Sequence, residues 1–167
     1  MTAIGGIATF TDIYLEEAGQ KIIAATKSDT SSIFFGTPQM SLNSSVFTVT
    51  PGPVSATNSL IAISPAPPDP PRIANGSEFY TVTFTLKDQY GNFVSGILPT
   101  MASNISGDTI SQPSQNTNSL GVTTGTISST IADFAPNLRS LSIASPSGLS
   151  AVKVDALFVP GAASRLA

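Results

Sequence analysis

The sequence predicts an all-β protein built as an antiparallel β-sandwich, and three observations point to this fold class. Apolar residues in the clearest segments recur with a period of two, not the period of about 3.6 that marks a helix. Turn signals such as Gly91-Asn92 and Ser147-Gly148 separate these segments. No stretch of ten residues has convincing helical periodicity. A succession of short strands and turns is typical of two packed sheets.

The alternation is clearest in residues 79–88 and 151–159, where every second residue is apolar. Successive side chains of a strand point to opposite faces, so one face of each segment should lie on a core. The expected core residues are Tyr80, Val82, Phe84, Leu86, Val152, Val154 and Phe158. Further strands are expected at residues 6–13, 20–27, 45–50, 59–64, 93–104, 122–131 and 138–144.

The composition argues against several functional classes. The net charge is −3 and only 10% of residues are charged, which does not favour binding to nucleic acid or to a membrane surface. The sequence contains no Cys, His or Trp. Disulfides, thiol catalysis and the commonest general base are therefore excluded, as is tryptophan stacking on sugars. We expect no enzyme activity, no cofactor, no metal and no catalytic residue.

Neither a signal peptide nor a transmembrane span is visible. The first residues lack a basic start, and no apolar run reaches the roughly 20 residues that cross a bilayer. If the protein is exported, we expect its signal to lie outside this chain.

An internal repeat organises the sequence. Residues 45–55 resemble residues 154–164, because both are a strand followed by Pro-Gly, a small pair and Ser, at an offset of 109 positions. Residues 6–9 match residues 121–124 at an offset of 115. This period fits one sandwich domain of about 100 residues with insertions.

The repeat predicts three divisions of the chain. Residues 1–55 are expected to be the C-terminal half of one repeat, residues 56–160 a complete repeat, and residues 161–167 the start of the next repeat or a tail. A half-repeat without its opposing sheet leaves an apolar face in water. Packing on the complete domain, completion by another chain through strand exchange or self-association, and poor order all remain open.

A proline-rich segment, residues 65–71, lies inside the complete repeat after its first short strand. It can be a hinge, or a stiff crossover between sheets that also blocks edge pairing. We favour the crossover.

Residues 74–96 closely resemble the bacterial immunoglobulin-like repeats of the invasin/intimin type. In that family an Asn-Gly turn precedes a long alternating strand, which runs into an Asp-x-x-Gly-Asn hairpin; here these are Asn75-Gly76 and Asp88 to Asn92. Residues 121–124 resemble the family's later Gly-hydrophobic-Ala-Thr strand, preceded here by Asn118-Ser119-Leu120. The resemblance implies tandem Ig-like Greek-key sandwiches in a rod on a bacterial surface or in a large secreted protein.

Four features of the sequence are candidates for functional or modification sites. Asp88 to Asn92 could suggest Ca²⁺, but that ion prefers several carboxylates, so a hairpin turn is preferred in which Asp88 binds loop amides and Gly91 has positive φ. Glu16-Glu17 is interpreted as a solvated turn. Arg139 is expected to cap a sheet edge with its head in water. Three Asn-x-Ser patterns, at Asn43, Asn75 and Asn104, are interpreted as chance matches.

The expected function is a non-enzymatic spacer or adhesin stalk that is extracellular or on the bacterial cell surface. Its expected partners are neighbouring Ig-like repeats of the same chain, together with a host or cell-surface ligand of unknown identity. The alternatives are a ligand- or carbohydrate-binding Ig-like module and a phage tail or fibre decoration domain.

Overall fold

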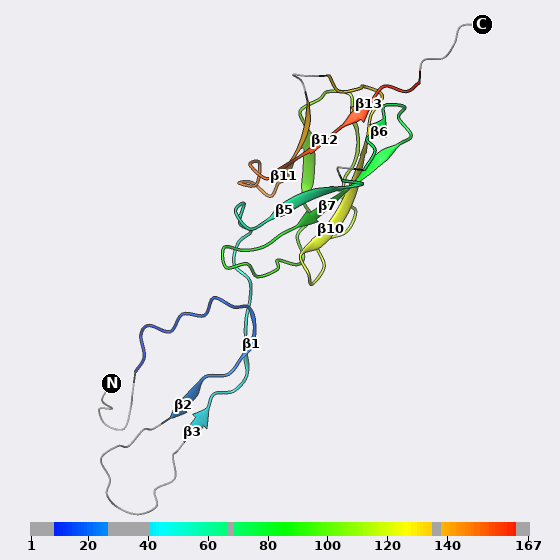
Figure 1. Ribbon diagram of the computed structural model, residues 1–167. Helices are drawn as coiled ribbons and strands as arrows, with labels where there is room; N and C mark the ends of the chain where they lie inside the picture. Colours follow the sequence, from blue (N-terminus) through cyan, green and yellow to red (C-terminus); the bar gives the residue numbers. More distant parts are fainter. Residues whose placement is uncertain (1–8, 27–40, 67–68, 135–137, 163–167) are drawn as a thin grey trace, which may run out of the picture. The chain divides into compact units, whose positions relative to one another are not determined.

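The computed structural model describes residues 9–26, 41–66, 69–134 and 138–162. Within these ranges every element of regular secondary structure is a β-strand, which confirms the predicted all-β class. The chain divides into two compact units, residues 1–50 and residues 51–167 (Figure 1). Among the described residues, no helix is long and apolar enough to cross a membrane.

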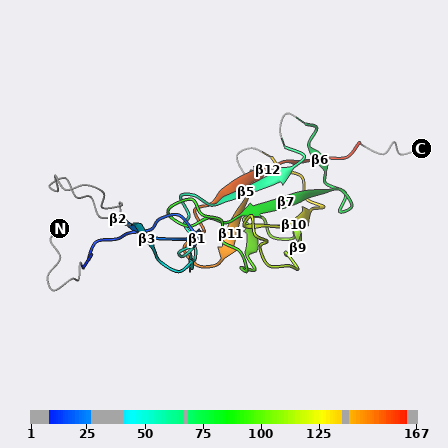
Figure 2. The same ribbon diagram turned by 90° about the horizontal axis from the view of Figure 1, so that it is seen from below.

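The second unit is a sandwich of two antiparallel sheets. One sheet has the order β5 (Leu60–Ser64), β7 (Phe79–Thr85), β10 (Val122–Ser128) and β9 (Thr109–Ser111). The other has the order β12 (Lys153–Ala156), β11 (Arg139–Ser145) and β8 (Thr100–Ser103). The chain changes sheet between β7 and β8, between β8 and β9 and between β10 and β11. Strands β5 and β12 lie at one edge of the sandwich (Figures 1 and 2).

The proline-rich segment leads from the four-stranded sheet to a separate two-stranded sheet, so the predicted crossover between the two main sheets stays a prediction. It follows β5, which pairs with β7, and leads into β6 (Arg72–Ile73), which pairs in parallel with β13 (Phe158–Val159) beyond β12. Tyr80 fastens the end of this segment. Its hydroxyl donates to the carbonyl of Leu157 at 2.7 Å and accepts from the amide of Arg72 at 3.1 Å.

The core lies between the sheets and consists largely of alternate strand residues. Val82, Phe84 and Leu86 have no exposed surface, and neither does Phe158 on the other side. The rings of Tyr80 and Phe158 meet edge to face with their centroids 5.2 Å apart. Burial of each large apolar side chain stabilises the fold by roughly 1.5–3 kcal/mol. The predicted core is confirmed, with Val154 half-buried against its margin.

The turn before β10 depends on Gly121. Its φ is +68°, and a Cβ atom there would lie 2.4 Å from the carbonyl oxygen of Leu86. Asn118 closes the turn, because its side-chain oxygen accepts from the amides of Leu120 and Val122 at 2.9 and 3.0 Å. The Asn118 side chain thus closes the turn, and Gly121 permits the close approach of the chain to Leu86.

In the first unit, the described strands form two short antiparallel pairs. β1 (Gly19–Lys21) pairs with β4 (Phe47–Val49), and β2 (Ala24–Thr26) pairs with β3 (Ser41–Asn43). The strand expected at residues 20–27 is therefore interrupted at Ile22 and Ile23. The described part of the strand expected at residues 6–13 forms no strand.

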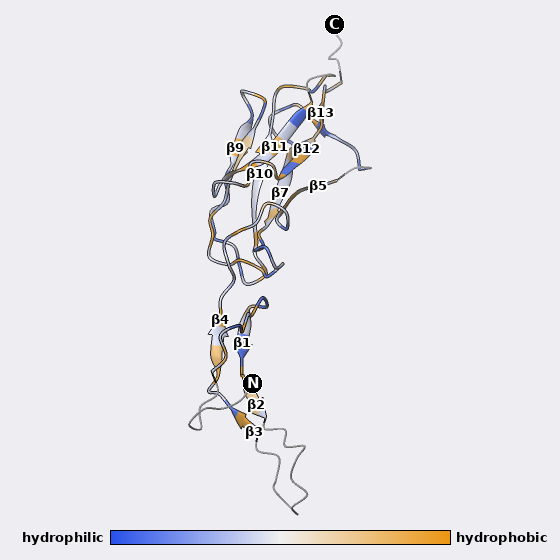
Figure 3. Cartoon of the chain, turned by 90° about the vertical axis from the view of Figure 1, so that its left-hand side faces the viewer, coloured by the Kyte–Doolittle hydropathy of each residue, from blue (hydrophilic) through white to orange (hydrophobic). Residues whose placement is uncertain are grey.

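Several large apolar side chains of the first unit are exposed to solvent. Figure 3 shows hydrophobic residues on β3 and β4. Among the described residues, the buried apolar cluster belongs entirely to the second unit. The exposed large apolar residues of the first unit are Phe10, Ile13, Tyr14, Leu15, Ile22, Ile23, Leu42 and Val46.

Candidate functional site

The turn after β7 is organised around Asp88, which is 1% exposed. Its Oδ1 atom accepts hydrogen bonds from the amides of Tyr90 and Asn92, each at 2.9 Å. Its Oδ2 atom accepts from the amide of Gly52 and from Nδ2 of Asn92, each at 2.9 Å. Gly91 has a φ of +86°. The predicted turn, with Asp88 bonded to loop amides and Gly91 at positive φ, is confirmed.

Asp88 also fastens the segment that leads into the sandwich, residues 51–55, called here the lead-in segment. Besides the bond from Gly52, Val54 forms an antiparallel bridge with Asp88. Asn58 lies just beyond the segment and donates from Nδ2 to the main-chain carbonyl of Asp88 at 2.9 Å. These contacts place residues 51–55 with the second unit, whereas the sequence frame grouped them with the first half-repeat.

The hydrogen bonds at Asp88 favour its charged form. Burial by itself raises the pKa of the Asp88 carboxyl, but donation from the Asn92 side chain and from the amides of Gly52, Asn92 and Tyr90 outweighs it. The pKa therefore lies below the ordinary value of 3.8. Protonation would weaken the acceptor for these four donors at once.

A second polar group, the Arg139 cluster, lies inside the sandwich. Arg139 is 0% exposed, with Nε 2.8 Å from Oδ2 of Asp108 and Nη1 2.7 Å from Oδ2 of Asp133. The prediction that Arg139 caps a sheet edge with its head in water was wrong. The long side chain points inward, and two carboxylates from the loops after β8 and β10 neutralise it there.

The cluster joins distant parts of the chain. Asp133 accepts from the amide of Phe158 at 2.7 Å and donates its own amide to the Phe158 carbonyl at 2.8 Å. The Arg139 guanidinium lies 4.7 Å from the centroid of the Phe158 ring. Sequence reasoning did not connect Asp108 or Asp133 with Arg139. The available signal was the parity of Arg139 with Leu141 and Ile143, which places it on the core face.

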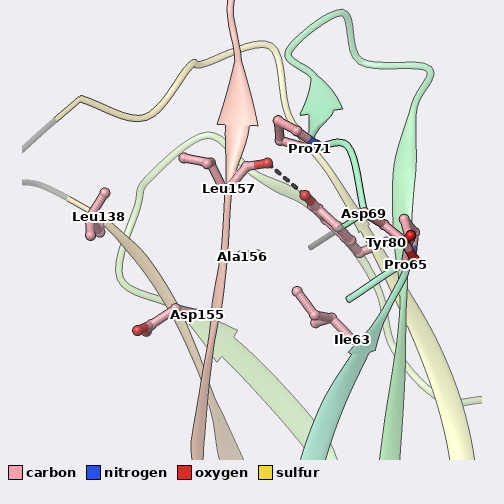
Figure 4. Close-up of a pocket in the computed structure, with 9 residues that line it drawn as sticks. All are labelled: Ile63, Pro65, Asp69, Pro71, Tyr80, Leu138, Asp155, Ala156 and Leu157. Carbon is pink, nitrogen blue, oxygen red and sulfur yellow. Dashed lines mark hydrogen bonds between the residues drawn. The ribbon is translucent and has the colours of Figure 1, made fainter. Parts of the chain in front are cut away.

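An open cavity of about 310 Å³ lies where the proline-rich segment leaves β5 (Figure 4). Ile63, Pro65, Tyr80 and Leu157 form apolar parts of its wall, and Asp69 and Asp155 also line it. The Tyr80 hydroxyl is engaged with Leu157 and Arg72. The described lining residues supply shape and apolar surface, and the Tyr80 hydroxyl has a structural role.

The remaining candidate residues have local structural roles. Glu16 and Glu17 are exposed as predicted, and Glu17 pairs with Lys21 at 2.7 Å. Asn75 accepts from the amides of Ser77 and Glu78, each at 2.8 Å, and so shapes the turn before β7. Asn104 is hydrogen-bonded to main-chain atoms of Leu138 and Ser140, whereas Asn43 is exposed on β3.

Comparison with protein families matches the middle part of the sandwich. The family model described as bacterial Ig-like domain (group 1) matches residues 67–135. This part of the chain is similar to a bacterial Ig-like domain. The match includes the Asp88 turn and extends from the proline-rich segment into the loop that follows β10. Comparison with curated protein sequences gave no match.

Solved structures show the same Ig-like fold. Invasin, described as a bacterial integrin-binding protein, matches 86% of this chain with a TM-score of 0.52 and 17% identity. InvD of Yersinia pseudotuberculosis matches 86% with a TM-score of 0.55 and 17% identity. The adhesin InvE of the same organism matches 65% with a TM-score of 0.50 and 25% identity. The resemblance to the invasin-type Ig-like family is thereby confirmed.

The chain spans only a part of each of these proteins. It covers 25% of the invasin structure, 28% of the InvE structure and 48% of the InvD structure. The similarity therefore concerns the Ig-like architecture.

Proposed function

We propose that the chain is a non-enzymatic Ig-like repeat segment of a large bacterial cell-surface or secreted protein, in which it acts as a spacer in an adhesin stalk. The observation that carries this proposal is the attachment of the lead-in segment to Asp88. A spacer has to keep the path of the chain fixed where one repeat follows another. Here the lead-in segment is bonded to a buried carboxylate at the start of the sandwich.

The far end of the domain supports the same proposal. The final strand, β13, pairs with β6, and the amide and carbonyl of Phe158 are both bonded to Asp133. Tension applied at either end would therefore load hydrogen bonds that run across the chain, and these must break together. Such an arrangement suits a load-bearing repeat.

The location and partners follow from this role. We propose an extracellular or cell-surface location, with neighbouring Ig-like repeats of the same chain as the main partners. Strand exchange or self-association through the first unit is the alternative to a neighbouring repeat as partner, and the exposed apolar residues of this unit are available for it. The sequence lacks Cys and His, which supports a non-enzymatic role.

Antibody labelling of intact producing cells tests the proposal. Antibodies raised against the purified chain should label intact cells or the secreted fraction. In parallel, the purified chain should fail to bind host cells or a glycan array, because a spacer carries no ligand site of its own. Labelling that requires cell lysis would contradict the proposal.

A ligand-binding module is the second candidate, and one observation favours it. Tyr90 and Phe93 are 53% and 41% exposed in the same turn, with Nζ of Lys87 4.8 Å from the centroid of the Phe93 ring. Aromatic surface of this kind can contact a sugar or a protein. Glycan binding that is lost in Tyr90→Ala, while the melting temperature is kept, would favour this candidate over the spacer.

A further inference from the structure

One strand pair of the first unit, β1 with β4, is equivalent to the pair of β11 with β12 in the Ig-like domain. In the first unit Lys21 lies opposite Phe47, and in the domain Arg139 lies opposite Ala156. Phe47 and Ala156 are 109 positions apart, which is the offset that relates the two Pro-Gly motifs. The register therefore makes Lys21 the counterpart of Arg139.

The surroundings of Lys21 reproduce part of the Arg139 cluster. Lys21 pairs at 2.7 Å with Glu17, four residues earlier, as Arg139 pairs at 2.7 Å with Asp133, six residues earlier. Phe47 supplies an aromatic ring opposite Lys21, as Phe158 supplies one beneath Arg139. The second carboxylate of the cluster, Asp108, comes from the loop before β9, in the first half of a repeat.

The two clusters differ in their burial. The Arg139 side chain is 0% exposed, whereas the side chains of Lys21 and Glu17 are 23% and 85% exposed. Ile23, two residues beyond Lys21, is 39% exposed, while its counterpart Leu141 is 0% exposed. In the domain, β5, β7 and β10 form the sheet that faces β11 and β12.

We propose that the first unit is an acceptor surface for the first half of an Ig-like repeat of the same type. The bound half supplies the counterparts of β5 and β7 in the facing sheet, and an aspartate equivalent to Asp108 completes the ion cluster at Lys21. A second carboxylate suits this position because Glu17, the present partner of Lys21, is 85% exposed, whereas the buried Arg139 has two carboxylate partners. The proposal rests on the repeat architecture proposed above.

A duplication within the full chain tests the proposal. A copy of residues 51–120 is inserted directly before Gly6, because Gly6 is the counterpart of Gly121, which follows Leu120 in the complete repeat. The readout is amide hydrogen exchange in residues 19–26 and 41–49. We expect amide exchange there to slow at least about 100-fold, since the strands would then open only together with the completed sandwich. Unchanged exchange in a folded extended chain would overturn the proposal.

Substitutions in the inserted copy test its chemistry. Asp108→Asn in the copy should restore faster exchange by about 10-fold or more, because the buried cation loses a carboxylate. Asp69→Asn in the copy is the matched control, since Asp69 is exposed, and it should leave exchange unchanged. If exchange stays slow in the Asp108→Asn variant, the aspartate of the inserted copy does not complete the ion cluster at Lys21.

Two further measurements keep the test decisive. Lys21→Met should leave exchange in the original chain unchanged but should accelerate it in the extended chain, and no effect in the extended chain would overturn the proposal. Sedimentation of the original chain tests another occupant. A dimer in which β1 and β4 are already protected would overturn the proposal, because a second copy would then cover the face. Amide protection of β7 and β11 is followed in the same samples. It reports whether the complete Ig-like domain, on which the proposed spacer function rests, is folded.

Discussion

Arg139 and Phe158 are stacked inside the sandwich, with the guanidinium 4.7 Å from the ring centroid and Asp133 hydrogen-bonded to both residues. A full positive charge therefore lies between the sheets, neutralised by two carboxylates. The same contacts fix β13, the last strand of the domain. The cluster thus links the stability of the core to the anchoring of the end of the domain.

Removing the charge of Arg139 should strongly destabilise the domain. Arg139→Met leaves Asp108 and Asp133 buried without a cation, so the free energy of unfolding should fall by about 3–5 kcal/mol. Urea denaturation checks this value. The triple variant Arg139→Met/Asp108→Asn/Asp133→Asn should recover part of the loss, and a single variant as stable as the wild type would contradict the role of the cluster.

Phe84 tests the assignment of the core. Phe84→Ala removes a ring with no exposed surface and should lower the free energy of unfolding by about 3–5 kcal/mol. Phe79→Ala is the matched control, since this ring lies on the same strand but is 51% exposed, and its loss should be less than half as large. Equal losses for the two variants, measured by chemical denaturation, would refute the assignment.

Asp88 should make stability depend on pH. Its folded pKa lies below 3.8, so its charged form stabilises the fold above that value, and this stabilisation is lost as the pH falls through the folded pKa. The wild type should therefore be more stable than Asp88→Asn near neutral pH, and the difference should shrink as the pH falls from about 6 to below about 3. Thermal melts over this range check the trend. A difference independent of pH would show that the charge is not the cause.

Alanine substitutions at Gly121 and Gly148 distinguish the cost of backbone strain from the cost of steric overlap. Both have positive φ, but an added Cβ meets the Leu86 carbonyl at 2.4 Å only at Gly121 and meets nothing within 4 Å at Gly148. Gly148→Ala should cost about 1–2 kcal/mol from the left-handed conformation alone, and Gly121→Ala clearly more. The comparison is made by urea denaturation. Similar costs at the two positions would argue against the close approach at Leu86.

The sequence predicted the features that local patterns encode. The alternation around Tyr80 and Phe84 identified β7 and its buried face, because a period of two requires no knowledge of the partner strand. The Asp88 turn was predictable for the same reason, since its carboxylate bonds mainly to nearby amides. The additional bond from Gly52 joins residues 36 positions apart and left no local signal.

Features that depend on distant partners were missed or misjudged. The strand expected at residues 93–104 shortens to Thr100–Ser103, because Gly96 adopts a φ of +81° and Pro99 follows it. β6 and β9 have two and three residues, too few for a pattern, and their pairing partners define them. The inward position of Arg139 depends on Asp108 and Asp133, which only the folded chain brings together.

Stretching single molecules from their two ends tests the spacer function most directly. The account predicts one abrupt unfolding event for residues 51–162, whose extended length is roughly 370–400 Å at about 3.3–3.6 Å per residue. Asp88→Ala should unfold at lower force, because the lead-in segment is released. Gradual extension without an abrupt event, in a chain whose domain is folded before pulling, would contradict a load-bearing role.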